Sequence, residues 1–168
     1  KEQDGETGVP VVYMTTDISS QGLMNMYQAL SASPSGKIAV KLHTGEKNGP
    51  NIIPRPWVRE LLAKEMSEAV IVETNTYYEG DRYTTRQHRE TLQVNGWTFC
   101  PVDILDEDGT VSLPVKNGKW FSEMSMGKNI VNYDSMLVLT HFKGHTMGGF
   151  GGSGKNIGIG CADGRIGK

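Results

Sequence analysis

Three of the four histidines stand in polar segments that follow apolar runs. His43 opens the segment HTGEKNG, and His141 and His145 enclose the segment HFKGH. Imidazole and carboxylate groups are common ligands of divalent metals, and histidines four residues apart can reach one metal. The sequence therefore predicts a divalent metal site built from His43, Glu46, His141 and His145. The alternative is structural: one histidine packs beneath its loop and the other hydrogen-bonds the backbone.

Other side chains in the same segments are suited to an anionic ligand. Arginine offers a planar pair of donors to a carboxylate or phosphate, and lysine offers a point charge. The segment TYYEGDRYTTRQH over residues 76–88 holds Arg82 among tyrosines and threonines. The plain alternative is a solvated loop that leads into a helix capped by Thr84 or Thr85. The residues predicted to bind a small anionic ligand are Asn75, Tyr78, Arg82, His88, Lys143, Lys155 and Asn156.

The run GFGGSGKN over residues 149–156 nearly matches the nucleotide-binding loop GxxxxGK[ST]. Asn156 stands where a hydroxyl should hold magnesium. The residues that follow carry many glycines, and each costs a helix interior about 1 kcal/mol relative to alanine. We therefore reject a P-loop NTPase. Glycines also let backbone N–H groups converge on an anion or on another chain segment, and this is the role we expect here.

Alternating apolar patterns predict an α/β fold. Apolar β-branched runs predict strands, and apolar residues at helical spacing predict helices between them. Strands are predicted over residues 9–15, 37–42, 68–73, 98–104 and 135–142, and helices over 20–32, 57–66 and 84–95. Crossover connections of this kind give mainly parallel strands. We predict a Rossmann-like three-layer sheet with flanking helices, plus a β-hairpin insertion over residues 111–121.

This arrangement would gather the polar segments at one place. Ligands of open α/β sheets bind beyond the carboxyl ends of the strands. The segments 43–49, 75–82 and 141–145 each follow a predicted strand. We therefore expect a shared polar site at the C-terminal edge of the sheet.

Length and charge limit the possible partners. The 168 residues suit one domain, predicted as a flexible leader over residues 1–8 and an α/β domain over 9–168 that is truncated at its C-terminus. The net charge of −2, without a basic cluster, argues against nucleic acid. No apolar run reaches the roughly 18–20 residues of a membrane span. The leader is compatible with a cytoplasmic protein and with one exported after signal removal.

Three segments together resemble the DUF362 family, a domain of unknown function found in iron–sulfur-centre-type proteins. They are KLHTGE over residues 41–46, the pattern NTxYxGxRxxTxxH over 75–88, and HFKGHxxGGFGGxxKNxGxG over 141–160. The resemblance implies redox association, because many members carry a ferredoxin-like stretch with clustered cysteines. Cys100 and Cys161 are the chain's two cysteines, whereas an iron–sulfur cluster typically takes four thiolates, so we expect no such cluster within this chain.

Two functional hypotheses follow from the sequence. In the first, the chain is an enzyme-like or redox-associated domain that binds a small anionic ligand, with or without a divalent metal. In the second, it is a non-catalytic module, such as an envelope or electron-transfer partner protein. Its glycine-rich segment would then contact a missing C-terminal segment or a second polypeptide.

Overall fold

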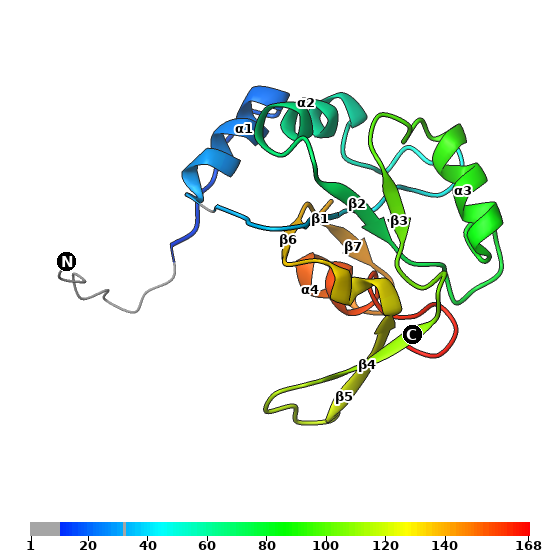
Figure 1. Ribbon diagram of the computed structural model, residues 1–168. Coiled ribbons are helices and arrows are strands. Elements are labelled where there is room, and N and C mark those ends of the chain that lie inside the picture. Colours follow the sequence, from blue (N-terminus) through cyan, green and yellow to red (C-terminus); the bar gives the residue numbers. More distant parts are fainter. Residues whose placement is uncertain (1–10, 32) are drawn as a thin grey trace.

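The computed structural model describes residues 11–31 and 33–168 of the chain (Figure 1). The predicted leader and the first two residues of the predicted strand 9–15 lie outside the described residues. Residues 11–15 form no strand, so this prediction was wrong where it can be compared. Val12 and Met14 are each 87% exposed. The run has strand-like composition, but no strand in the described part of the chain pairs with it, and a strand is stabilised by its partners.

Four parallel strands form the central sheet, in the order β3-β2-β1-β6. They are β1 (Ile38–Lys41), β2 (Val70–Glu73), β3 (Val102–Ile104) and β6 (Ser135–Val138). The register places Val40 beside Ile71 on one side and Leu137 on the other. Because the strands are parallel, their carboxyl ends meet at one edge. The predicted α/β class and parallel sheet are confirmed.

Three helices supply the larger part of the core. They are α1 (Ser20–Ala29), α2 (Arg55–Glu65) and α3 (Thr85–Val94). Ser19 caps α1, and Thr84 forms a capping box with Gln87 at the start of α3, so both helices begin at residues that satisfy free N–H groups. Leu61 of α2 and Leu92 of α3 share one buried cluster with the strand residue Ile71.

A second, smaller core joins the sheet to an antiparallel hairpin and to the C-terminal segment. The hairpin pairs β4 (Thr110–Pro114) with β5 (Glu123–Gly127) and is followed by the 3-10 helix η1 (Lys128–Asn132). Ala39 and Val72 pack there with Leu105, Met126 and Cys161. The predicted insertion is confirmed, but its second strand begins later than residue 120, because an eight-residue connection over residues 115–122 separates the two strands.

The glycine-rich segment is structured. It forms a short hairpin of β7 (Lys143–His145) and β8 (Gly149–Gly151), then helix α4 (Ser153–Gly158). We expected too many glycines for a helix, and that expectation was wrong for these residues. Tertiary contacts hold this short helix, since Asn156 Nδ2 donates to Thr140 Oγ1 at 3.1 Å beyond the end of β6. Among the described residues, no helix is long and apolar enough to span a bilayer.

Candidate functional site

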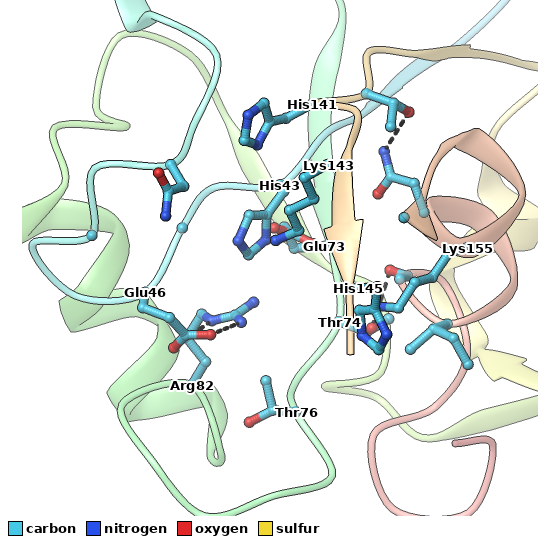
Figure 2. A pocket seen from close by; sticks show the side chains of 18 of the residues that line it. His43, Glu46, Glu73, Thr74, Thr76, Arg82, His141, Lys143, His145 and Lys155 are labelled. Atoms are coloured by element: carbon cyan, nitrogen blue, oxygen red, sulfur yellow. Dashed lines mark hydrogen bonds and ion pairs between the residues drawn. The ribbon is translucent and has the colours of Figure 1, made fainter. Parts of the chain in front are cut away.

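A cavity of about 550 Å³ lies at the carboxyl edge of the sheet. Its walls come from the segments after β1, β2 and β6, from the β7–β8 hairpin and from α4. Figure 2 shows the Glu46–Arg82 pair on one side of the cavity and His145 with Lys155 on the other. Segments far apart in the sequence thus meet where the parallel sheet predicts a ligand site.

Most of the residues predicted to form the site line this one cavity. They are His43, Glu46, Tyr78, Arg82, His141, Lys143, His145, Lys155 and Asn156. Asn75 and His88 do not line it. His88 is fully buried, with Nδ1 3.3 Å from Asn75 Oδ1. Their part in ligand binding stays a prediction, and the contacts show them bracing the loop after β2.

A buried ion pair lines the cavity at the ends of two central strands. Lys41 Nζ lies 2.6 Å from Glu73 Oε2, and the two residues are 1% and 3% exposed. The other carboxylate oxygen accepts from the Thr44 backbone at 2.8 Å and from its hydroxyl at 2.9 Å. Burial alone would raise the pKa of Glu73, but the charges of Lys41 and Arg82 outweigh it and hold that pKa well below its usual value. Sequence analysis missed this pair.

Arg82 is committed to a partner inside the protein. Its guanidinium pairs with the Glu46 carboxylate through both Nη2 and Nε, and Nη2 donates to the Tyr78 hydroxyl at 3.2 Å. Tyr78 also donates to Glu46 at 2.8 Å. Arg82 is 6% exposed, so its positive charge is neutralised where it stands. This arrangement also occupies the Glu46 carboxylate that was predicted to hold a metal.

The loop that carries His43 and Glu46 is fixed from below. Trp97 Nε1 donates to the Thr44 carbonyl at 2.8 Å. Asn95 Nδ2 donates to the Glu46 carbonyl at 2.9 Å, and Asn95 Oδ1 accepts from the Asn48 backbone at 2.9 Å. Both side chains follow α3 and are buried. This wall of the cavity is therefore held in place before any ligand arrives.

Three lysines in the cavity lack a carboxylate within ion-pair distance, among the residues described. The lining holds five cationic side chains, from Arg82 and four lysines, and two carboxylates, a net charge of +3 with neutral histidines. The Arg82–Glu46 and Lys41–Glu73 pairs cancel internally. The excess falls on Lys143, Lys155 and Lys168. By contrast, the whole chain has a net charge of −2.

Two of these lysines converge on the same glycine. A Cβ built on Gly151 would lie 3.6 Å from Lys155 Cδ and 3.8 Å from Lys143 Cγ, so the stems of both lysines pack against it. Lys168 is held elsewhere, donating to Thr74 Oγ1 at 2.9 Å and to the Asn75 carbonyl. Burial lowers the pKa of Lys168 to about 8. Lys143 and Lys155 both line the cavity, so each adds positive charge that an anion there would offset.

Three histidines add hydrogen-bonding groups to the cavity. His145 Nδ1 accepts from the Gly148 backbone at 3.1 Å and from that of Met147 at 3.3 Å, which leaves the proton of a neutral ring on Nε2. Burial lowers the pKa of His43 to about 4, although Glu73 opposes the shift, so its ring is neutral at pH 7. His141 Nδ1 is buried and has no hydrogen-bond partner within residues 11–31 and 33–168.

The structure brings the four predicted metal ligands to one cavity but not into one cluster. Over residues 11–31 and 33–168, no group of three or more His, Cys, Asp and Glu side chains is close enough to hold a metal ion. Metal binding therefore stays a prediction. Asn156 has a structural task in addition to its place in the lining, because its amide ties α4 to Thr140.

The buried imidazole of His88 predicts a pH-dependent stability. Burial lowers its pKa to about 4, whereas an unfolded histidine titrates near 6.5. Between these values the unfolded chain binds the extra proton, so stability is fully present above pH 6.5 and is lost as pH falls toward 4. We expect a slope of up to about 1.4 kcal/mol per pH unit from this group. Urea unfolding at pH 7 and pH 5 measures it, and His88→Gln should flatten the slope; an unchanged slope would assign it to other groups.

Gly160 predicts a second, steric effect. A Cβ on Gly160 would lie 2.3 Å from the Asn156 carbonyl oxygen and 2.7 Å from Lys41 Cε. Gly160→Ala should therefore destabilise the protein by about 1–3 kcal/mol, as forced overpacking does. Gly158 in α4 is the matched control, because no atom lies within 4 Å of its added Cβ. Thermal unfolding should show Gly158→Ala at or above wild type; equal losses in both variants would refute the close approach.

Comparison with known proteins supplies a family. The chain matches the family described as "Domain of unknown function (DUF362)" over residues 38–168, which is more than half of its length. No curated protein and no solved structure matches it. The matched region runs from β1 to the last residue and so includes every segment that lines the cavity. The chain belongs to the DUF362 family.

Proposed function

We propose that this domain binds a small polyanionic ligand, with phosphate or carboxylate groups, at the carboxyl edge of its sheet. One observation carries the proposal: three lysines that have no carboxylate partner among the described residues line a cavity whose other charges are paired internally. Without a counter-ion, repulsion among these positive charges would lower the stability of the folded protein. An anionic ligand offsets it.

The side chains around the cavity have different roles in this proposal. Lys143 of the β7–β8 hairpin and Lys155 of α4 provide the charge, and His145 of the hairpin provides an N–H donor. Arg82 contributes indirectly. It holds Glu46 and Tyr78 in position and so shapes the wall across the cavity from His145 and Lys155. The volume of about 550 Å³ lies within the range of small-ligand and cofactor sites.

A divalent metal is the second candidate ligand. It is favoured by His43, His141 and His145, which line the same cavity. Burial keeps His43 unprotonated at neutral pH, the state in which imidazole binds metals. The redox association implied by the family resemblance would act through such a ligand. The sequence-based alternative, an interaction module, is less well supported, because it does not explain a positively charged cavity that three histidines also line.

Thermal unfolding in a panel of salts tests the proposal. Inorganic phosphate, pyrophosphate and citrate should raise the unfolding temperature above that in chloride at the same ionic strength, because a ligand that binds only the folded state stabilises it. Pyrophosphate and citrate should exceed phosphate, since each carries more charge. Equal temperatures in all four salts would contradict anion binding, and a rise only with Zn²⁺ or Mn²⁺ would favour the metal.

A further inference from the structure

The loop that joins β4 to β5 presents two aromatic rings to solvent. It has the sequence KNGKWF over residues 116–121. Trp120 is 80% exposed and Phe121 is 71% exposed. Figure 1 shows this hairpin projecting from the body of the molecule, beyond the sheet and its helices. The two rings are neighbours in the chain and each has a large apolar area, so together they form an apolar patch at the end of the hairpin.

The loop is a defined turn. Val115 N–H donates to the Ser122 carbonyl at 2.8 Å, which closes the hairpin below the loop, and Gly118 N–H donates to the Val115 carbonyl at 3.2 Å. A Cβ on Gly118 would lie 1.9 Å from the Phe121 carbonyl oxygen, so this curl requires glycine. Asn117 adopts a left-handed conformation with φ of 58°. The rings are thus held at the tip by the backbone.

The tip also carries unbalanced positive charge. Lys116 and Lys119 are exposed, and residues 115–122 contain no acidic side chain. Lys119 Nζ lies 5.0 Å from the centroid of the Trp120 ring, so charge and ring face the same solvent. Tryptophan favours the water–bilayer interface, and lysine is attracted to anionic headgroups. The tip therefore has the charge that complements an anionic lipid surface.

Geometry favours a bilayer over a protein partner. A stable protein interface buries about 800 Å² on each side. A six-residue convex loop can supply that area only to a deep, matching groove. A bilayer interface receives a protrusion of two rings without a preformed groove, and the lysine stems can extend from it to the headgroups.

We propose that the β4–β5 tip docks on an anionic membrane surface, with Trp120 and Phe121 in the headgroup region and Lys116 and Lys119 against lipid phosphates. This inference is independent of the anion-binding cavity. Such docking would hold the domain at a membrane without a spanning segment. It would be weak and reversible, because only two rings and two charges contribute.

Vesicle co-sedimentation tests the proposal. The purified protein is mixed with vesicles of phosphatidylcholine alone or with about one third phosphatidylserine, near the anionic content that attracts basic segments. We expect binding to the anionic vesicles, with a shift of Trp120 fluorescence to shorter wavelength that is absent from Trp120→Phe. Lys116→Gln with Lys119→Gln should lower the partition coefficient about 30-fold, from about 1 kcal/mol per lysine.

Matched variants separate the tip from general charge. Lys64→Gln with Lys128→Gln removes the same charge from exposed positions elsewhere and should bind like wild type. Trp120→Ser with Phe121→Ser should abolish binding while unfolding as wild type does, since neither ring belongs to a core cluster. Equal binding to both vesicle types, or no binding by folded wild-type protein, would overturn the proposal. Self-association lost in the Trp120→Ser, Phe121→Ser variant would overturn it in favour of a second copy.

Discussion

Glu73→Gln is expected to destabilise the protein by about 3–5 kcal/mol, the largest effect of any single substitution considered. The carboxylate is 3% exposed and lies 2.6 Å from Lys41 Nζ. Glutamine keeps the shape and can still accept from Thr44, but it leaves the lysine charge buried without a counter-ion. An unpaired buried charge costs far more than a lost surface contact. Urea unfolding, monitored by circular dichroism at pH 7, measures the difference.

Two further variants make this result specific. Glu60→Gln breaks the exposed Glu60–Lys64 pair, also 2.6 Å long, and should leave the unfolding curve unchanged. Lys41→Met combined with Glu73→Gln should recover most of the lost unfolding free energy, because an apolar side chain replaces the lysine whose charge Glu73→Gln leaves unpaired. A single Glu73→Gln variant with the wild-type midpoint would show that the pair is not buried as described.

Lys143→Gln combined with Lys155→Gln is expected to weaken binding of inorganic pyrophosphate at least 100-fold. Each lysine would contribute a charge-assisted hydrogen bond of about 1.5–3 kcal/mol, so two remove about 3 kcal/mol or more. The free protein should be as stable as wild type or more stable, since the variant lowers the excess positive charge of the cavity. Calorimetric titration and urea unfolding of the same samples test both halves.

Measuring affinity for pyrophosphate and stability toward urea on the same samples distinguishes a binding role from a structural role, because loss of a structural role would lower both. Lysines that only supported the hairpin would lower stability and binding in parallel. Lys64→Gln with Lys128→Gln provides equal loss of charge at exposed positions that do not line the cavity. A similar loss of binding in that control would attribute the effect to overall charge.

The parallel sheet could be predicted because its signal is local. The runs KIAVKL and EAVIVE are short, apolar and β-branched, and both became neighbouring strands. Strand direction alone predicted that His43, Arg82 and His145 would meet at one edge of the sheet, and all three line the cavity. The run over residues 11–15 has the same local signal but pairs with none of the described strands, and pairing is a tertiary property.

The internal pairing of the site could not be predicted from the sequence. Arg82 and Glu46 were assigned to a ligand and to a metal, yet they neutralise each other. Lys41 and Glu73 end two buried strands, and a charge at the end of an apolar run is a signal that could have marked them. Which charges cancel depends on distances of a few ångströms between segments 30 or more residues apart. Sequence spacing does not contain those distances.

The most direct test of the anion-binding account is calorimetric titration of inorganic pyrophosphate into the wild-type protein, with a chelator present to remove metal. The account predicts one saturable site whose affinity falls as salt rises, which survives in Lys64→Gln with Lys128→Gln and is lost in Lys143→Gln with Lys155→Gln. Absence of a saturable site in folded protein, or equal affinity in the two double variants, would contradict it.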